Sequence, residues 1–169
     1  LFLSYISKMT KNLDDIGLKS VADHFDLFFV DLWGVVHNGI ELYKESTHAL
    51  EKLLEANKEL VLLTNAPRPN NDVVNFLKKM GLEQKYYSKV YTSGEAALNY
   101  LTSNFKDKTF FHIGPPRDFG LFNDFKKNKI QTISEAKYLL CTGLFDEHEK
   151  ELSYYKSFLK NEIDKIMIC

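Results

Sequence analysis

The stretch that decides the fold is Phe28-Phe29-Val30-Asp31-Leu32-Trp33-Gly34-Val35-Val36-His37-Asn38-Gly39, an apolar run that delivers one carboxylate and then reaches a glycine. Residues 27–30 predict a strand buried on both faces, as central parallel strands are. Asp31 follows the carboxyl end of that strand, where open α/β sheets keep their binding crevice. A carboxylate there loses hydration unless a cation or hydrogen-bond donors meet it. We therefore interpret Asp31 as part of a functional site.

Helices and short apolar strands alternate along the chain, which predicts an α/β fold with a parallel, doubly wound sheet. The signal Asn38-Gly39 predicts a type I′ turn and a small hairpin after Asp31. Thr92-Ser93-Gly94-Glu95 predicts a helix start, since Ser93, Gly94 and Glu95 suit a helix cap. The expected helices cover residues 14–24, a segment from Ser46 with a stripe of Ala49, Leu50, Leu53 and Leu54, then 72–80 (ending at Gly81), 96–105 and 147–160; the expected strands cover 27–30, 59–64, 89–92, 109–113, 138–142 and 165–169.

Composition excludes several classes of function. The chain has 169 residues, 44% of them hydrophobic, and 22 basic against 23 acidic residues, so neither nucleic acid nor an anionic membrane surface is indicated as a partner. No apolar stretch reaches the ~20 residues of a membrane span. Cys141 and Cys169 form no CxxC motif, and reduced thiols in a cytoplasmic protein are the plain interpretation. The opening residues 1–7 are too short for a signal peptide, and Met9 is a candidate native start.

These motifs resemble a known family. Asp31 after an apolar strand, Gly34 and the hairpin that follows resemble the first motif of the haloacid dehalogenase-like (HAD) phosphohydrolases, and Val61-Leu62-Leu63-Thr64-Asn65 resembles the second. The sequence around these motifs is similar to an uncharacterised bacterial branch of the type IIA subgroup. The subgroup includes nitrophenyl, nucleotide and sugar-phosphate phosphatases. That similarity rests on Trp33, His37-Asn38-Gly39, Asn65-Ala66-Pro67-Arg68-Pro69, Thr92-Ser93-Gly94-Glu95, Ile113-Gly114-Pro115-Pro116-Arg117-Asp118 and Cys141-Thr142-Gly143-Leu144-Phe145-Asp146-Glu147.

The resemblance implies Mg²⁺-dependent hydrolysis of a small phosphomonoester, with Asp31 as the nucleophile that forms an aspartyl-phosphate. It implies that Asp31 and the backbone carbonyl of Trp33 bind Mg²⁺. The Thr64 hydroxyl would bind a phosphoryl oxygen, with the Asn65 backbone N–H and the Gly34 region as further donors. The expected architecture is a partial HAD-like Rossmannoid core over residues 1–101 and an inserted, incomplete α/β cap over 102–169.

Two departures from the family pattern bear on activity. The position two residues after Asp31, an aspartate in most family phosphatases, is Trp33, which cannot exchange a proton. His37 is the nearest titratable substitute. The lysine and the Gly-Asp loop of the third and fourth motifs are not found before Cys169, so we expect the chain to be the front part of a longer protein with an exposed, apolar strand edge that favours pairing between copies.

Alternatives exist both to phosphatase activity and to a functional role for individual residues. A catalytically inactive HAD-fold remnant, or a protein that binds a phosphorylated ligand, is the competing function, and a dinucleotide-binding domain is disfavoured because no G-x-G-x-x-G follows the first strand. Arg68 is either a substrate-phosphate ligand or a solvated turn arginine. His112 is interpreted as a satisfied core or interface histidine, and the cluster Asp146-Glu147-His148-Glu149 as a charged helix start that suits the helix dipole.

Overall fold

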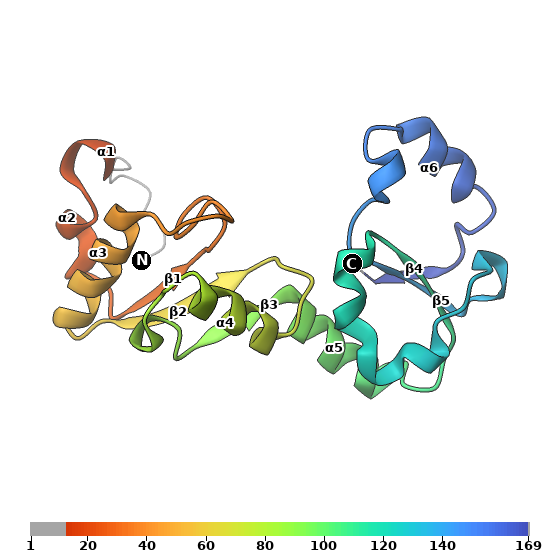
Figure 1. Cartoon of the computed structure of the whole chain (residues 1–169), viewed down its shortest axis with the longest axis horizontal. Coiled ribbons are helices and arrows are strands. Elements are labelled where there is room, and N and C mark those ends of the chain that lie inside the picture. The colour runs from red at the N-terminus through yellow and green to blue at the C-terminus, as the bar shows by residue number, and fades with distance from the viewer. Residues whose placement is uncertain (1–12, 169) are drawn as a thin grey trace, which may run out of the picture. The chain divides into compact units, whose positions relative to one another are not determined.

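The computed structural model of the chain describes residues 13–168 (Figure 1). Three interpretations concern residues outside the described ones: that residues 1–7 are too short for a signal peptide, that Met9 is a candidate native start, and that Cys169 is a reduced thiol. None of the helices in residues 13–168 is long and apolar enough to cross a membrane. The predicted α/β class with parallel sheets is confirmed.

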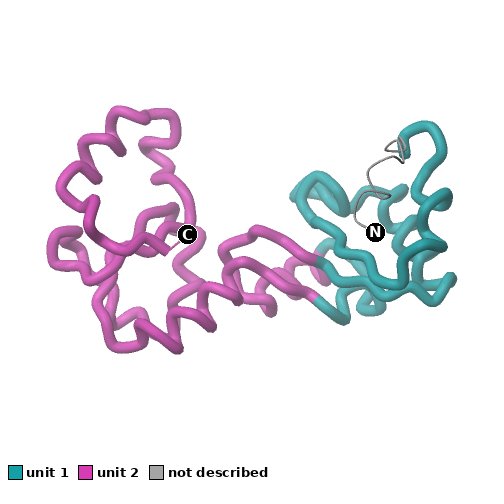
Figure 2. Tube along the Cα trace, turned by 180° about the vertical axis from the view of Figure 1, so that it is seen from behind, with its two compact units in different colours: residues 1–62, 80–89 teal, residues 63–79, 90–169 magenta. Residues whose placement is uncertain are grey.

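The chain divides into two compact units, which Figure 2 colours separately. Within the described residues, unit 1 holds 13–62 and 80–89, and unit 2 holds 63–79 and 90–168. The predicted boundary between a core and a cap after Leu101 stays a prediction. Unit 1 contains α1 (Leu13–Ile16), α2 (Lys19–Ala22), β1 (Leu27–Val30), α3 (Lys44–Glu55), the start of β2 (Glu59–Thr64) and the 3₁₀ turn η1 (Gln84–Tyr86). Unit 2 contains the end of β2, then α4 (Asn70–Lys79), β3 (Val90–Thr92), α5 (Ser93–Asn104), β4 (Phe110–Ile113), η2 (Pro116–Asn128), η3 (Ile133–Glu135), β5 (Tyr138–Cys141), η4 (Asp146–His148), α6 (Leu152–Phe158) and β6 (Ile166–Ile168).

The first sheet has the strand order β1-β2-β3. β1 and β2 pair in parallel, from Leu27 opposite Glu59 to Val30 opposite Leu62. The crossover between them is α3, whose buried side chains Leu50 and Leu53 come from the predicted apolar stripe. This is the predicted β-α-β order, and the bounds of β1 and β2 agree with the predicted strands.

The prediction that β1 is buried on both faces is wrong. Leu27 and Phe29 are exposed, with Phe29 at 65%, whereas Leu60, Val61 and Leu62 of β2 are buried. β1 is an edge strand of the sheet, and no described segment covers the face that Phe29 presents. An apolar run fixes a strand, but its burial depends on what packs against each face.

The predicted type I′ turn at Asn38-Gly39 is also wrong, although the chain reverses direction there. An antiparallel bridge joins His37 to Leu42, and the Tyr43 amide donates to the Val36 carbonyl. A type I′ turn needs positive φ at both central residues, and only Gly39 has it, with φ of 90°. The Asn38 side chain instead accepts hydrogen bonds from the amides of Ile40 and Glu41, at 2.9 Å each, while isolated bridges join His37 to Trp33 and to Leu42. Asn38 therefore caps a tight loop with its amide oxygen, an alternative that asparagine offers in turns.

Two predicted helices are interrupted. The helix expected over residues 14–24 is split at Gly17, which has φ of 70° and ends α1 in the left-handed region that glycine favours. The helix expected over residues 147–160 is the short turn η4 followed by α6. The ring of His148, in η4, stacks on Tyr154 at a centroid distance of 3.6 Å, and this local packing replaces a continuous first turn. The acidic cluster therefore begins a 3₁₀ turn and not an α-helix.

The second sheet has the order β4-β5-β6, with all strands parallel, and forms the middle of a three-layer arrangement in unit 2 (Figure 1). Alternate side chains of β4 and β5 point to opposite faces. One face carries Phe110, Tyr138 and Leu140, which pack with residues of α5 and η2. The other face carries Ile113 and Leu139, which pack with residues of α6. Both faces of these strands are covered, which explains why they are continuous apolar runs.

His112 is the polar exception in this sheet, and its interpretation as a satisfied core histidine is confirmed. It is 4% exposed, and its Nε2 lies 2.8 Å from Thr142 Oγ1. Burial lowers the pKa of His112 to about 4, with a smaller contribution in the same direction from the positive charge of Lys129.

The lowered pKa of His112 makes stability depend on pH. The unfolded chain, in which the pKa of His112 is near 6.5, binds more protons than the folded chain as pH falls from 6.5 towards 4. The free energy of unfolding should therefore decrease over that window. Urea unfolding of His112→Asn should show a smaller decrease than wild type, while His48→Asn, at an exposed position of α3, should match wild type. An unchanged pH dependence in His112→Asn would contradict this assignment.

The packing around the second sheet can be tested with a matched pair of substitutions. Leu140→Ala removes a side chain that is 1% exposed and should lower the free energy of unfolding by about 2–5 kcal/mol. Leu152→Ala, at a side chain that is 69% exposed, should change it by less than about 0.5 kcal/mol. Urea denaturation measures both, and equal losses would show that the described packing of β5 is incorrect.

Candidate functional site

Asp31 begins the loop that follows β1 in unit 1. Its side chain is exposed, and its Oδ1 accepts a hydrogen bond from the Leu32 amide at 2.7 Å. The Leu32 side chain is buried, and its carbonyl accepts hydrogen bonds from the amides of Val35, Val36 and His37. Three amides of this tight loop thus donate to one carbonyl, that of the buried Leu32. The carboxylate of Asp31, at the start of the loop, is exposed to solvent.

Trp33 and Gly34 continue this loop. The Gly34 amide donates to the His37 carbonyl at 2.8 Å, and Gly34 has φ of 76°, a conformation that favours glycine. The bridge between Trp33 and His37 uses the flanking Leu32 carbonyl and Gly34 amide, so the Trp33 carbonyl accepts no hydrogen bond from residues 13–168. The Trp33 indole is 66% exposed and lies against Gly39, where an added Cβ would be 2.5 Å from the ring.

His37, the nearest titratable group to Trp33, is buried. It is 4% exposed, its Nδ1 accepts a hydrogen bond from the Gly39 amide at 3.0 Å, and its ring meets the Trp33 indole edge-on. Burial lowers the pKa of His37, and the negative charge of Asp31 offsets part of that effect. A ring that accepts at Nδ1 is neutral and carries its proton on Nε2. This geometry makes His37 a support of the loop, and its role as a substitute acid stays a hypothesis.

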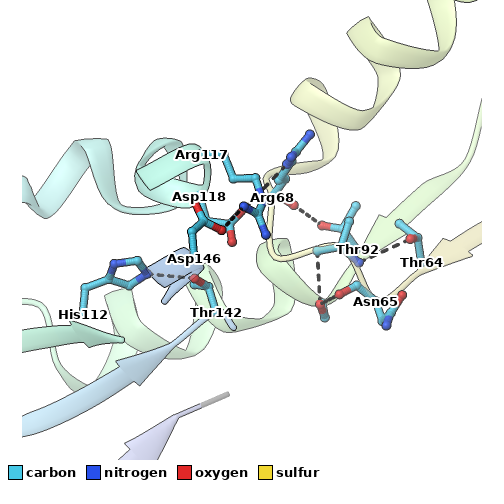
Figure 3. Close-up of polar contacts among 11 residues, drawn as sticks. Thr64, Asn65, Arg68, Thr92, His112, Arg117, Asp118, Thr142 and Asp146 are labelled. Atoms are coloured by element: carbon cyan, nitrogen blue, oxygen red, sulfur yellow. Dashed lines mark hydrogen bonds and ion pairs between the residues drawn. The ribbon is translucent and has the colours of Figure 1, made fainter. Parts of the chain in front are cut away.

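Thr64 and Asn65 lie in unit 2, where β2 ends. Thr64 is buried, and its Oγ1 accepts a hydrogen bond from the Ala66 amide at 3.3 Å. Asn65 is exposed, and its carbonyl accepts a hydrogen bond from Ser93 Oγ at 2.8 Å. The Ala66 carbonyl also accepts from the Gly94 amide. The turn after β2 is therefore fixed to the start of α5 (Figure 3).

The start of α5 resembles a capping box in which Asn70 connects the two capping residues, Thr92 and Glu95. Thr92, the N-cap, accepts from the Glu95 amide at 2.9 Å, as a Thr-x-x-Glu sequence predicts. The Glu95 carboxylate does not return to the Thr92 amide. It accepts from the Asn70 amide at 3.0 Å, and the Asn70 side chain accepts from the Thr92 amide at 3.0 Å. The cap is therefore Thr92 itself, one residue before the predicted Ser93-Gly94-Glu95 segment.

Arg68 is held at its backbone by the same cap. The Thr92 hydroxyl donates to the Arg68 carbonyl at 2.6 Å, and Gly94 packs so closely that an added Cβ would lie 2.3 Å from the Arg68 nitrogen. The Arg68 Nε lies 3.9 Å from Oδ1 of Asp118, a carboxylate that is 5% exposed. Sequence reasoning gave Asp118 no role, because the two residues are 50 positions apart and no local signal links them.

The site residues expected from the sequence thus fall into two groups. Asp31, Trp33 and Gly34 share one loop of unit 1, and Thr64 and Asn65 share one turn of unit 2. Among residues 13–168, no group of three or more His, Cys, Asp or Glu side chains could hold a metal ion. The side-chain donor at the first loop is a single carboxylate, and the roles assigned to these five residues stay predictions.

The Thr92 hydroxyl should be required for the stability of unit 2. Thr92→Val removes a hydroxyl that both accepts from Glu95 and donates to Arg68, so the free energy of unfolding should fall by about 1–2 kcal/mol. Thr92→Ser keeps the hydroxyl and should lose much less. Chemical denaturation measures both variants. A Thr92→Val protein as stable as Thr92→Ser would contradict the importance of this hydroxyl.

Solved structures of known proteins share the fold of this chain. The chain is similar to a hydrolase of the haloacid dehalogenase-like family from Brucella suis 1330, with 28% identity and a TM-score of 0.75 over 96% of this chain and 60% of that chain. It is similar to 4-nitrophenylphosphatase from Thermotoga maritima, with 25% identity and a TM-score of 0.57 over 87% and 55% of the two chains. A glycerol phosphate phosphatase from Mycobacterium tuberculosis in complex with magnesium, at 18% identity and a TM-score of 0.51 over 73% and 38% of the two chains, shares the fold.

The chain therefore spans at most about 60% of the length of these relatives. No curated protein matches it. The relatives bear out the resemblance to the type IIA subgroup. A family model described as haloacid dehalogenase-like hydrolase matches residues 28–128, which include the Asp31 loop, the Thr64 turn and Asp118. The chain belongs to the haloacid dehalogenase-like hydrolase family.

Proposed function

We propose that this chain carries the phosphoryl-transfer residues of a Mg²⁺-dependent phosphatase for small phosphomonoesters, with Asp31 as the nucleophile. The observation that carries the proposal is the exposed Asp31 carboxylate directly after β1, a strand that pairs in parallel with β2. Parallel strands end at the same edge of a sheet, and Thr64 is the last residue of β2. A joint role for Asp31 and Thr64 is what the resemblance to the family implies.

The relatives support the class of reaction. 4-Nitrophenylphosphatase and glycerol phosphate phosphatase act, by their names, on phosphate monoesters with different leaving groups. They share the fold of this chain, and its membership of the haloacid dehalogenase-like hydrolase family supports the hydrolase class. The identity of the leaving group is not a property that a shared fold transfers.

The residues of the first loop fit a Mg²⁺ ion that takes few protein ligands. Mg²⁺ prefers oxygen ligands, keeps several waters and is often bound by one or two carboxylates together with a substrate phosphate. The Asp31 carboxylate and the Trp33 carbonyl, which accepts no hydrogen bond from residues 13–168, supply two such oxygens. When bound, Mg²⁺ would neutralise charge between the carboxylate and the phosphate dianion.

The proposed reaction has two displacements. An Asp31 carboxylate oxygen attacks phosphorus and forms the aspartyl-phosphate, while the bond from phosphorus to the ester oxygen breaks and the leaving alcohol takes up a proton. Water then attacks phosphorus, loses a proton, and releases inorganic phosphate and the Asp31 carboxylate. The Thr64 hydroxyl and the Asn65 amide would donate to phosphoryl oxygens. The Gly34 amide, which donates to the His37 carbonyl here, could join them only if that bond opens.

The source of the leaving-group proton separates this chain from an ordinary family phosphatase. Trp33 cannot supply the proton, and His37 is buried with its Nδ1 already engaged. Leaving groups that depart without protonation, such as a nitrophenolate, should therefore be favoured over simple alkoxides. This is the reason to test the chain first with an aryl phosphate.

A second function is favoured by the same observation at Trp33. A HAD-fold protein without a proton donor at this position can bind a phosphorylated ligand with Mg²⁺ and not turn it over. The two functions differ in whether phosphate is released from an aryl phosphate, and not in whether the ligand binds. The expected small phosphorylated metabolite, the expected lack of nucleic-acid and membrane partners, cytoplasmic location and pairing between copies remain proposals from the sequence.

The nucleophile is tested by a pair of aspartates at the two ends of β1. Asp31→Asn should lower kcat for 4-nitrophenyl phosphate by at least about a thousandfold, because it removes the attacking carboxylate. Asp26→Asn, a fully exposed carboxylate just before β1, should leave kcat within about twofold of wild type, since it lies at the opposite end of the strand. Steady-state hydrolysis with Mg²⁺ and with EDTA measures both.

The outcomes separate the two functions. Turnover that requires both Mg²⁺ and Asp31 supports the phosphatase. A folded chain that binds phosphate with Mg²⁺ in an Asp31-dependent manner, but releases none from the aryl ester, supports the binding protein. Turnover that is equal in Asp31→Asn and wild type would contradict both assignments of Asp31.

A further inference from the structure

Unit 2 contains a polar cavity that the proposed reaction does not use. Its volume is about 360 Å³, and it lies between α4 and the start of η2. One wall is a single face of α4 that carries Asp72, Phe76 and Lys79, since positions i, i+4 and i+7 share a helix face. The opposite wall includes Arg117 and Leu121. The cavity is thus lined by charged side chains together with the apolar side chains of Phe76 and Leu121.

The chain places its only two arginines at this cavity. Of its 22 basic residues, 20 are lysines, and only Arg68 and Arg117 are arginines. Both line the cavity although they are 49 positions apart in the sequence. A guanidinium is a planar fork of donors that matches a carboxylate or a phosphate in a bidentate way, which a lysine ammonium does not. The use of arginine here, and lysine elsewhere, points to recognition of an oxyanion.

Each arginine is positioned by an acidic partner. Arg117 Nη1 lies 2.6 Å from Asp146 Oδ1, and Arg68 Nε lies 3.9 Å from Asp118 Oδ1 (Figure 3). A guanidinium has five N–H donors, so one carboxylate contact leaves the others available. The Arg68 backbone is also fixed, as described above, by the Thr92 hydroxyl. Each guanidinium therefore has one acidic neighbour and N–H donors to spare, and side-chain exposures of 42% for Arg68 and 61% for Arg117 keep them accessible.

The side chains that line the cavity carry one more positive than negative charge. They are the cationic Arg68, Arg117 and Lys79 and the carboxylates of Asp72 and Asp118. Asp146, which is not part of the lining, pairs with Arg117. Asp118 is buried, and its charge is balanced by Arg68. Lys79 forms no ion pair with residues 13–168. An anionic group that enters the cavity can thus meet two guanidiniums and an ammonium.

We propose that this cavity binds an anionic group of a small ligand, a carboxylate or a phosphate, through Arg68 and Arg117. The identification of that ligand with the substrate of the enzyme, whose leaving portion would then carry a second anionic group, rests on the proposed function. The binding itself does not involve Asp31 or Mg²⁺. It can therefore be tested separately from catalysis.

The test follows the Nε–H signals of the two arginines by NMR while the chain is titrated with succinate or with inorganic phosphate. EDTA removes Mg²⁺, and sodium chloride keeps the ionic strength constant. Only two arginine Nε signals exist, so each substitution assigns one of them. Both signals should shift and saturate together. Saturation with succinate alone identifies a carboxylate site, saturation with phosphate alone identifies a phosphate site, and either result supports the proposal.

Matched variants give the test its controls. Arg117→Gln and Arg68→Gln should each weaken binding by about tenfold or more, since each removes charge-assisted hydrogen bonds. Arg68→Lys keeps the charge but loses the fork, and should fall between wild type and Arg68→Gln. Lys127→Gln, which removes one positive charge from η2 outside the cavity, should bind as wild type does.

Two results would overturn the proposal. One is the absence of saturable shifts at both arginines with either anion. The other is affinity in Arg117→Gln, an exposed position that should not impair folding, equal to that of Lys127→Gln. Because the readout requires no turnover, a chain that fails as a phosphatase but shows these shifts would still support the anion site.

Discussion

The parallel pairing of β1 with β2 is the constraint on which the account of this protein depends. Four residue pairs, from Leu27 opposite Glu59 to Val30 opposite Leu62, fix the direction and register of both strands. A parallel pair requires a crossover, and α3 provides it by burying Leu50 and Leu53. Asp31 follows the carboxyl end of β1, whereas Asp26 precedes its amino end.

A second constraint acts within unit 2, at the start of α5. The side chain of Asn70 accepts from the Thr92 amide, and the Asn70 amide donates to Glu95, so the capping box of α5 also closes the turn after β2. The Thr92 hydroxyl adds the Arg68 carbonyl to this network. The segment that carries Thr64 and Asn65 is therefore held by hydrogen bonds to residues some 25 positions later. The same bonds fix the backbone of an arginine at the polar cavity.

The sequence predicted the elements better than their surroundings. Residues 27–30 and 59–64 form strands as predicted, because a short apolar run between polar segments has few other low-energy states. The exposure of Phe29 could not be read from that run, since burial depends on what covers the sheet. The failure of the type I′ turn has a local cause, namely the Asn38 side chain, which bonds the next amides and removes the need for positive φ at Asn38.

Contacts between residues far apart in the sequence limit how much of the candidate site can be predicted from the sequence. Asp31 and Thr64 were predicted as site residues because Asp31 directly follows an apolar strand and Thr64 ends one, a pattern visible within a few residues. The ion pair of Arg68 with Asp118 and the bond from Asn70 to Glu95 join residues 50 and 25 positions apart, and nothing in either local sequence announces its partner. The chemistry of Trp33 is visible in the sequence, but the burial of His37, the nearest titratable substitute, needed the structure.

The central claim is that the Asp31 carboxylate attacks phosphorus, and the direct measurement is a search for the covalent intermediate. The chain would be mixed with an aryl phosphate and Mg²⁺, quenched in acid, digested and analysed by mass spectrometry. We expect one phosphoryl group on the peptide that contains Asp31, absent without Mg²⁺ and absent in Asp31→Asn. Hydrolysis of the ester with no phosphoryl group on Asp31, or with the group on another residue, would contradict it.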